Sequence, residues 1–516
     1  MEGESLYLLG IDIGTTSVKA VVFNEDGRRI SKAVEEYSLE TPKPDYVELD
    51  PEVYWRSCVR AVREAAKPIS DKNEIKALSI SSQGETLIAI DEKGNPLQKA
   101  IVWLDNRSKD EAEEIAKRFG REVYEVTGQP TVVPTWPATK ILWMKKRIPH
   151  LFKEVKTFMM VEDYIIYRLT GRRITEPSIC SSTLLFDIRR DRWWGEMLEY
   201  LGIGEDQLPE IVRSGAVIGE LTEEASESLG LPKQTIVASG AFDQAAAAIG
   251  AGNIEEGVVS ESTGAALAIV ATTTKRIYDP MKRIPLHRHA APGLYFLMPW
   301  CQTAGIILKW FRDRFAQPEK VVGETLGVSA YEILDREAER VPPGSGGLII
   351  LPHFAGAASP EFDPMARGVF FGLTLSHDRR HIIRAMLEAI GYMLRRNIEL
   401  LKGLGIPIKE VRSIGGGARS RIWCRIKADI LQTPILVPVE EETACLGAAI
   451  LAGIASGEYR DLRNAVRRLV IIGERIDPDP GNRLTYTRLY EIYVELYERL
   501  RELFPKLAAA SQPLRE

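Results

Sequence analysis

The stretch YLLGIDIGTTSVKAVVFNEDG, residues 7–27, determines how the rest of the chain is interpreted. An apolar run ends at the small-residue turn Gly14-Thr15-Thr16, and a second apolar run follows over 18–23. This pattern predicts two strands joined by a tight turn. Such a turn can offer backbone N–H groups and hydroxyls to phosphate oxygens, although an ordinary hairpin turn uses the same residue types.

A second copy of this unit lies in the other half of the chain. The stretch GVVSESTGAALAIVATTTK, residues 257–275, again gives a strand, the turn Ser262-Thr263-Gly264 and a strand. A repeat at this distance predicts two similar domains in one α/β chain. We place the first domain at 1–252, the second at 253–505 and a loose tail at 506–516.

Composition limits the classes of function. The chain has 516 residues, 67 Lys and Arg against 72 Asp and Glu, and 45% hydrophobic residues. The formal net charge of -5 argues against a dedicated nucleic-acid binder. No apolar stretch approaches the length of a membrane span, and five scattered cysteines argue against a disulfide framework or a structural zinc site. We expect a cytoplasmic globular protein with no nucleic-acid or membrane partner.

Apolar periodicity predicts further elements. Helices are expected over 51–67, 108–119, 138–146, 160–169, 194–201, 303–315, 378–403, from about 420, over 443–457 and over 487–504. A strand is expected over 411–414, directly before Gly415-Gly416-Gly417. These glycines allow a planar ring or a phosphate to approach the backbone, and a tight strand–helix turn explains them equally well.

Two aspartates stand where strands end. Asp12 closes the first strand, where a carboxylate could hold Mg²⁺ directly or through water. Asp243, followed by Gln244, lies between an apolar strand and a run of small residues typical of a closely packed helix. There it could accept a hydroxyl proton, or it could act as the N-cap of that helix.

A third group of polar residues suits a polyhydroxylated ligand. Gln83-Gly84-Glu85 separates two predicted strands, and Trp103 follows another apolar run. Acids and amides bind hydroxyls, and an indole ring covers C–H faces. A hairpin turn and a core tryptophan are the alternatives. No P-loop or Rossmann glycine pattern occurs.

Taken together and in this order, the motifs resemble those of the FGGY carbohydrate kinases. The resemblance covers about residues 6–460. It rests on the motifs that begin at Gly10, Trp103, Asp243, Ser262 and Gly415, and on Asp363-Pro364-Met365-Ala366-Arg367-Gly368 with Gly372-Leu373-Thr374. It implies two actin-like (ribonuclease H-like) α/β domains with a nucleotide and sugar cleft between them.

The resemblance also implies a role for each residue. Asp243 would be the general base, and Asp12 would help to position Mg²⁺. The sugar pocket would be lined by Gln83, Gly84, Glu85, Trp103, Asp243 and Gln244. ATP would contact Thr15, Thr16, Ser17, Lys19, Thr263, Gly264, Gly305, Gly416, Gly417 and Arg421. A homodimer is the expectation at family level.

The expected activity is transfer of the γ-phosphate of ATP to a hydroxyl of a small, pentulose-like ketose or a related polyol. Members resembling glycerol kinases carry Arg-Glu where this chain has Gly84-Glu85, and members resembling xylulose kinases carry Met-His-Gly after the glutamine. Gly84 is expected to open space for a larger substrate. The alternatives are a glycerol kinase, a non-metabolic actin-like ATPase and a catalytically silent sugar sensor.

Overall fold

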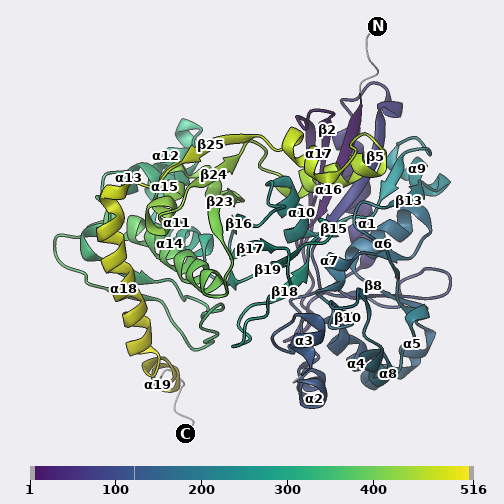
Figure 1. The fold of residues 1–516 in the computed structure, drawn as a ribbon, viewed down its shortest axis with the longest axis horizontal. Helices are drawn as coiled ribbons and strands as arrows, with labels where there is room; N and C mark the ends of the chain where they lie inside the picture. Colours follow the sequence, from purple (N-terminus) through teal and green to yellow (C-terminus); the bar gives the residue numbers. More distant parts are fainter. Residues whose placement is uncertain (1–5, 121, 511–516) are drawn as a thin grey trace. The chain divides into compact units, whose positions relative to one another are not determined.

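The computed structural model describes residues 6–120 and 122–510. The chain forms two compact units (Figure 1). The first comprises residues 1–254, 272–297 and 442–471, and the second comprises 255–271, 298–441 and 472–516. The predicted domain boundary after residue 252 lies two residues before the point, after residue 254, where the chain first passes from the first unit to the second. The units are nevertheless not continuous stretches, because 272–297 and 442–471 return to the first unit.

The first unit is built on one mixed sheet. Its strands follow the order β13-β14-β5-β1-β2-β3. They span β1 Tyr7–Ile13, β2 Ser17–Asn24, β3 Arg29–Glu36, β5 Ile75–Ser82, β13 Val217–Glu220 and β14 Ile236–Ala238. β1 and β2 form the predicted hairpin, β5 runs parallel to β1, and the short β15 (Ala241–Phe242) also pairs with β5.

The second sheet repeats this arrangement. β16 (Gly257–Thr263) and β17 (Leu267–Thr273) form an antiparallel hairpin, and β23 (Ile408–Ile414) runs parallel to β16. β20 (Trp300–Cys301) pairs with β17, while β24 (Ile435–Pro438) and β25 (Ile472–Ile476) continue beyond β23. The order β20-β17-β16-β23-β24-β25 therefore matches β3-β2-β1-β5-β14-β13, which confirms the predicted internal repeat.

Short two-stranded ladders complete the strands. They are β4 Glu48–Leu49 with β7 Ala100–Ile101, β6 Ile88–Ile90 with β8 Thr157–Met159, β9 Ile174–Thr175 with β12 Glu210–Ile211, β10 Phe186–Asp187 with β11 Arg192–Trp193, and β21 Ile349–Leu351 with β22 Val369–Phe371. The antiparallel pair β18 Leu286–Arg288 and β19 Tyr295–Leu297 instead continues the second sheet, in the order β18-β19-β17.

The helices lie close to their predicted positions. In the first unit they are α1 Pro51–Ala66, α2 Lys109–Phe119, α3 Val123–Thr127, α4 Pro137–Arg147, α5 Pro149–Glu154, α6 Val161–Thr170, α7 Pro177–Cys180, α8 Gly195–Leu201, α9 Glu223–Leu229, α10 Asp243–Gly250, α16 Thr443–Ala455 and α17 Leu462–Leu469. In the second they are α11 Gly305–Phe315, α12 Gln317–Leu326, α13 Ala330–Glu339, α14 Arg379–Gly403, α15 Arg421–Leu431, α18 Arg483–Leu500 and α19 Leu503–Ala510. No helix among these described residues is both long and apolar enough to span a membrane.

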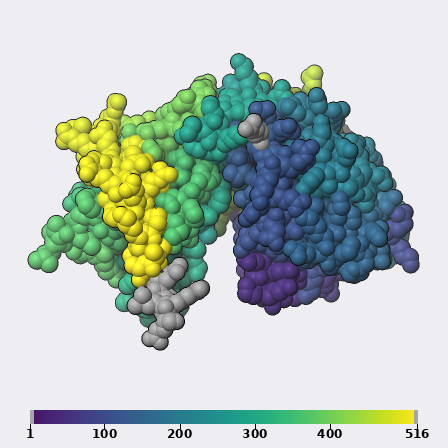
Figure 2. Space-filling view, turned by 90° about the horizontal axis from the view of Figure 1, so that it is seen from below, coloured from purple at the N-terminus to yellow at the C-terminus, as the bar shows by residue number. Residues whose placement is uncertain are grey.

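The predicted tail needs a correction. Residues 503–510 form α19, whose Phe504 is buried against Tyr497, so the chain remains helical well past residue 506. Figure 2 shows the C-terminal part of the chain, in yellow, along the surface of the second unit. The remainder of the predicted tail, 511–516, lies outside the described residues.

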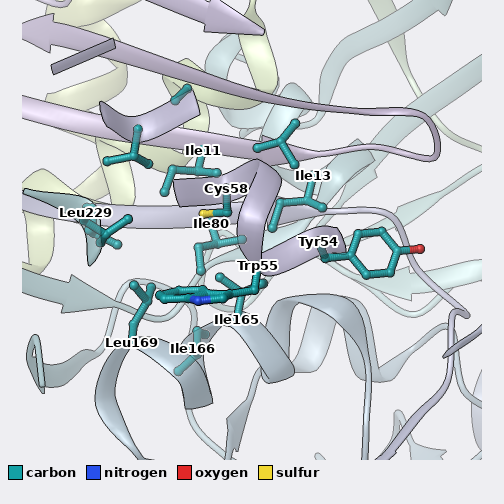
Figure 3. Packing of buried hydrophobic residues seen from close by; sticks show 14 of the residues in the cluster. Ile11, Ile13, Tyr54, Trp55, Cys58, Ile80, Ile165, Ile166, Leu169 and Leu229 are labelled. Carbon is teal, nitrogen blue, oxygen red and sulfur yellow. The ribbon is translucent and has the colours of Figure 1, made fainter. Parts of the chain in front are cut away.

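The core of the first unit lies between its sheet and α1 and α6. Figure 3 shows the indole of Trp55, from α1, among Ile80 of β5 and Ile165, Ile166 and Leu169 of α6. The helical spacing of apolar residues in α1 points one face at the sheet, and Asp50 caps the helix through the N–H of Glu52. This packing fixes the strand ends at which the candidate site lies.

Candidate functional site

The parallel strands β1, β5 and β15 bring the two predicted aspartates to one edge of the first sheet. Asp12 is level with Ser81 in the β1–β5 ladder, and Ser81 is level with Ala241 in the β5–β15 ladder. Asp243 follows β15 as the first residue of α10. The carboxyl ends of strands in open α/β sheets are a common place for ligands.

A glycine makes this close approach of β15 possible. A Cβ at Gly240 would lie 1.6 Å from the carbonyl oxygen of Ile80. Because only glycine fits there, β15 can pair with the end of β5. The N-cap of α10 is Phe242, so Asp243 is not the capping residue that the alternative interpretation required.

Three carboxyl groups share this edge and influence one another. Burial, together with the carboxylates of Asp12 and Glu85, raises the pKa of Asp243 to about 8, against hydrogen bonds from Gln244 that lower it. Burial likewise raises the pKa of Glu85 to about 7. The pKa of Asp12 is also raised by burial, although Lys19 and the Ser81 hydroxyl, 2.9 Å away, oppose this. Such a group of desolvated acids is typical of a site that takes up protons or cations.

Asp243 has an unused acceptor. Its Oδ1 is buried and has no hydrogen-bond partner within the described residues. Gln83 shows the same feature, because its amide nitrogen donates to the Tyr54 hydroxyl at 3.0 Å while its Oε1 has no partner there. Buried polar atoms are normally satisfied, so these two oxygens indicate that a ligand completes the site.

Gly84 does not open the space that the sequence suggested. A Cβ there would lie 3.1 Å from the Phe242 ring and 3.2 Å from Cβ of Ser182. The expectation of a pocket widened at Gly84 is therefore wrong, because Phe242 and Ser182 fill that volume. The next residue, Glu85, has a φ of 60°, a left-handed conformation that turns the chain sharply at this point.

A residue missed by the sequence analysis supports this turn. The side chain of Lys140, from α4, is fully buried and its Nζ donates to the carbonyl oxygens of Glu85 at 2.7 Å and Val102 at 3.1 Å. Lys140 thereby ties the Glu85 turn to the segment that carries Trp103. Nothing in the sequence distinguishes Lys140 from the exposed lysines of the same helix, because its role depends on distant carbonyl groups.

Trp103 links the predicted sugar pocket to the first glycine turn. Its Nε1 donates to the Thr15 hydroxyl at 2.9 Å. The turn is closed by the N–H of Gly14, which donates to the carbonyl of Ser17 at 2.9 Å. Thr16 is exposed at its tip. The structure therefore brings Thr15 into contact with Trp103, on the turn that follows β1 and Asp12.

The side chain of Lys19, expected to contact ATP, forms an ion pair within the protein. Its Nζ lies 2.8 Å from Oε2 of Glu442, and Lys32 contacts the other oxygen of that carboxylate. Glu442 and Asp12 raise the pKa of Lys19 while burial lowers it, with a net increase. The ion pair occupies one of the three N–H donors of Lys19 and holds its side chain towards Glu442, so only the remaining donors could contact a phosphate group.

The second turn assembles its own predicted residues within the second unit. The N–H of Gly264 donates to the carbonyl of Ala266 at 2.9 Å, and the N–H of Gly305 donates to the carbonyl of Gly264 at 2.9 Å. A Cβ at Gly417 would lie 2.7 Å from Cβ of Thr263, and Gly416 is adjacent. These contacts gather three segments next to Thr263: the turn 264–266, Gly305, and Gly416 with Gly417.

Two residues of the second unit differ from expectation. The Thr263 hydroxyl donates to Glu261 at 2.6 Å, so it lies beneath the turn and only the backbone of the turn is available to a ligand. Arg421 is largely exposed, and its Nε forms an ion pair with Glu474 at 2.7 Å, an interaction that the sequence did not indicate.

Protein ligands alone do not form a metal centre in the part of the chain that the structure describes, where no group of three or more His, Cys, Asp or Glu could hold an ion. Asp12 has one hydroxyl partner and a buried, destabilised charge. It therefore fits the requirement for a single carboxylate next to Mg²⁺, whose other ligands are usually water and substrate phosphate oxygens.

Comparison with known proteins assigns the family. The N-terminal domain of the FGGY family of carbohydrate kinases matches residues 7–250, and its C-terminal domain matches 260–456. A gluconokinase of Bacillus subtilis is 32% identical over 97% of this chain and 98% of its own length. A xylulose kinase of Staphylococcus xylosus is 29% identical over 95% of this chain and 100% of its own length.

A solved structure agrees with these relatives. The ligand-bound xylulose kinase from Lactobacillus acidophilus superposes with a TM-score of 0.88 at 28% identity, over 97% of this chain and 99% of that one. The two-domain actin-like fold predicted from the motifs is thereby confirmed. The chain belongs to the FGGY family of carbohydrate kinases and is an ATP-dependent phosphotransferase that acts on a sugar hydroxyl.

Proposed function

We propose that this kinase phosphorylates a small neutral ketose, pentulose-like in size, or a related polyol, with Asp243 as the general base. The observation that supports this most directly is the buried Asp243 Oδ1, which has no partner among the described residues and lies beside Glu85 and Asp12. A substrate hydroxyl would supply the missing donor.

In this mechanism Asp243 accepts the proton of the substrate hydroxyl as its oxygen attacks the γ-phosphorus atom of ATP. The O–H bond breaks, the new P–O bond forms, and ADP departs with the bridging oxygen of its β-phosphate. Catalysis of this kind depends on positioning and on charge stabilisation. Glu85, Gln83 and Gln244 would bind the other hydroxyls, and Trp103 would cover the apolar face of the sugar.

Each unit carries its own proposed nucleotide-binding turn. Thr15, Thr16 and Ser17 supply hydroxyl and backbone donors in the first unit. In the second unit, the backbone around Gly264 and the glycines Gly305, Gly416 and Gly417 permit close approach of phosphate and adenine. Mg²⁺ bound with ATP would neutralise phosphate charge, with Asp12 as its protein ligand.

The charge of the pocket favours a neutral substrate over an aldonate such as gluconate. The first unit contributes the carboxyl groups of Asp12, Glu85 and Asp243 to the site. The nearby lysine, Lys140, uses its Nζ on backbone carbonyl oxygens. A substrate carboxylate there would disfavour the ionisation of these buried acids still further, including that of the proposed base Asp243, whereas a neutral hydroxyl would not.

The test is ADP release from MgATP with a panel of ketopentoses, ketohexoses, glycerol, tetritols, inositol-like polyols and gluconate. Asp243→Asn serves as the control for each active compound. One strong, Asp243-dependent response to a neutral ketose, or to a polyol larger than glycerol, supports the proposal. A strong response to glycerol or gluconate would replace the proposed substrate class. ADP release independent of every compound would favour the non-metabolic ATPase instead.

A further inference from the structure

A fully buried ion pair lies directly beneath the second glycine turn. Lys427, in α15, places its Nζ 2.6 Å from Oε1 of Glu261, in β16, and both side chains have 0% exposure. Charged side chains are rarely buried to this degree. No charged residue of the predicted site is involved, so the catalytic mechanism proposed above does not account for this pair.

The pair holds the side chain of Thr263. The Thr263 hydroxyl donates to Oε2 of Glu261 at 2.6 Å and accepts from Lys427 Nζ at 3.0 Å. Ser413, on the adjacent strand β23, donates to Oε1 of Glu261. Hydrogen bonds to charged groups are stronger than neutral ones, so the orientation of the Thr263 side chain is firmly fixed.

The other side of Thr263 packs against the glycine loop. A Cβ at Gly417 would come within 2.7 Å of Cβ and 2.8 Å of Cγ2 of Thr263. A Cβ at Gly415 would lie 3.2 Å from both the Thr263 carbonyl oxygen and the Ser262 hydroxyl. Thr263 therefore stands between the ion pair below and residues 415–417 above, and the turn 264–266 continues from it.

Stability alone is a weak reason for such a pair. Desolvation of two charges often outweighs their attraction, and replacement by neutral side chains of similar volume is frequently neutral or stabilising. We propose that Lys427 and Glu261 are positioning residues for nucleotide binding. By fixing Thr263, they hold the second turn and residues 415–417 in one preformed arrangement for ATP.

This inference rests on the nucleotide-binding part of the proposed function and is independent of the identity of the sugar. Preformed backbone donors bind phosphate without the entropic cost of ordering a loop on binding. Loss of the network should therefore weaken nucleotide binding while it leaves sugar binding in the first unit unchanged.

The principal variant is Glu261→Gln/Lys427→Met, which removes both charges at similar volume and leaves no unpaired ion. Thr263→Val removes only the hydroxyl at constant shape, and Thr263→Ser restores it. The matched control is Glu388→Gln/Arg384→Met, a buried pair of the same unit with an Nε–Oε1 distance of 2.9 Å. Arg384 and Glu388 contact Val341, Gly344, Ser345 and Tyr486 rather than the turn.

Titration calorimetry with MgADP in the absence of sugar, steady-state kinetics and thermal unfolding are measured for each variant. We expect the dissociation constant for MgADP and the KM for ATP to rise about tenfold in the principal variant and in Thr263→Val. The KM for the sugar, kcat at saturating ATP and Tm should stay near the wild-type values. Thr263→Ser and the control pair should bind nucleotide like the wild type.

Several results would overturn the inference. Unchanged nucleotide binding in the folded principal variant would show that the pair has no positioning role. An equal loss in the control pair would point to general destabilisation of the second unit, and a wild-type protein that does not bind MgADP would remove the premise. A wild type that binds MgADP but phosphorylates no sugar would refute only the proposed function, because the binding comparison remains decisive.

Discussion

At the scale of single residues, Asp243 combines a buried carboxyl group with an acceptor oxygen that has no partner in the described structure. Asp243→Asn keeps the shape of the side chain but cannot accept a proton. We expect kcat to fall by at least about 10²-fold, the usual contribution of a general base, while the sugar still binds. Steady-state kinetics and calorimetric titration of the substrate measure the two quantities. Turnover within a few fold of the wild type would exclude Asp243 as the base.

The predicted site residues are marked by local sequence pattern, whereas the missed ones are defined by contacts with distant parts of the chain. Asp12, Asp243 and the glycine turns follow apolar strands, so their place at strand ends could be predicted from local pattern. Lys140, Glu261 and Lys427 act through partners 38 to 166 positions away. A single sequence carries no signal for such pairs, because burial and partner choice are decided by the assembled sheets.

At the scale of elements, Lys140 of α4 connects two segments of the proposed sugar pocket, those that carry Glu85 and Trp103. In Lys140→Met the carbonyl oxygens of Glu85 and Val102 lose their donor, and both segments should relax. Buried carbonyl oxygens without a donor are unfavourable, so the segments that carry them should shift and move the pocket residues out of place. We therefore expect the KM for the sugar to rise at least about tenfold. Nucleotide affinity should stay unchanged. Lys145→Met, in the same helix but bonded only to Tyr200 at 3.4 Å, is the control and should behave as the wild type.

The close packing of α10 against α16 is a second property of elements. A Cβ at Gly447 would lie 1.9 Å from the carbonyl oxygen of Ala246, and one at Gly250 would lie 1.9 Å from that of Thr443. Gly447→Ala must therefore push α16 away from α10. We expect a loss of at least about 2 kcal/mol in unfolding free energy, at the scale of overpacked cores.

Chemical denaturation of Gly447→Ala, followed by circular dichroism, measures this loss. Gly403→Ala is the control, because a Cβ at the end of α14 has nothing within 4 Å. That variant should be neutral or slightly more stable. Equal free energies of unfolding for the two variants would mean that α10 and α16 move apart without loss of stability.

At the scale of the whole molecule, the duplicated strand–turn–strand unit was sufficient to predict two domains of one architecture. The return of 272–297 and of α16 and α17 to the first unit could not be predicted in the same way. Helix α16 is apolar on all sides, with buried residues over most of its length. A pattern without a polar face predicts a buried helix but does not say which sheet covers it.

The stability of the molecule should depend on pH through a buried acidic group in the first unit. Glu162, Asp163 and Glu176 are fully buried, and burial raises the pKa of each, that of Asp163 to about 7. An acid whose folded pKa exceeds its unfolded value of 3.8 binds more protons in the folded state. Its stabilising contribution is complete below pH 4 and is lost as the pH rises through about 7.

Asp163→Asn replaces the titrating group with a neutral amide whose oxygen can still accept the N–H of Met160. The Tm of the variant relative to that of the wild type should be a few degrees higher near pH 8 than near pH 5, measured by differential scanning calorimetry. The control is Asp187→Asn, because hydrogen bonds and charge from Arg189 outweigh burial and lower the pKa of Asp187. A carboxyl group with a lowered pKa stabilises the folded state at every pH above its unfolded pKa. The Tm of Asp187→Asn should therefore lie below that of the wild type by the same amount at both pH values. A Tm difference between Asp163→Asn and the wild type that does not change with pH would contradict this prediction. It would show that Asp163 is ionised in the folded protein over the whole range, so that its pKa is not raised.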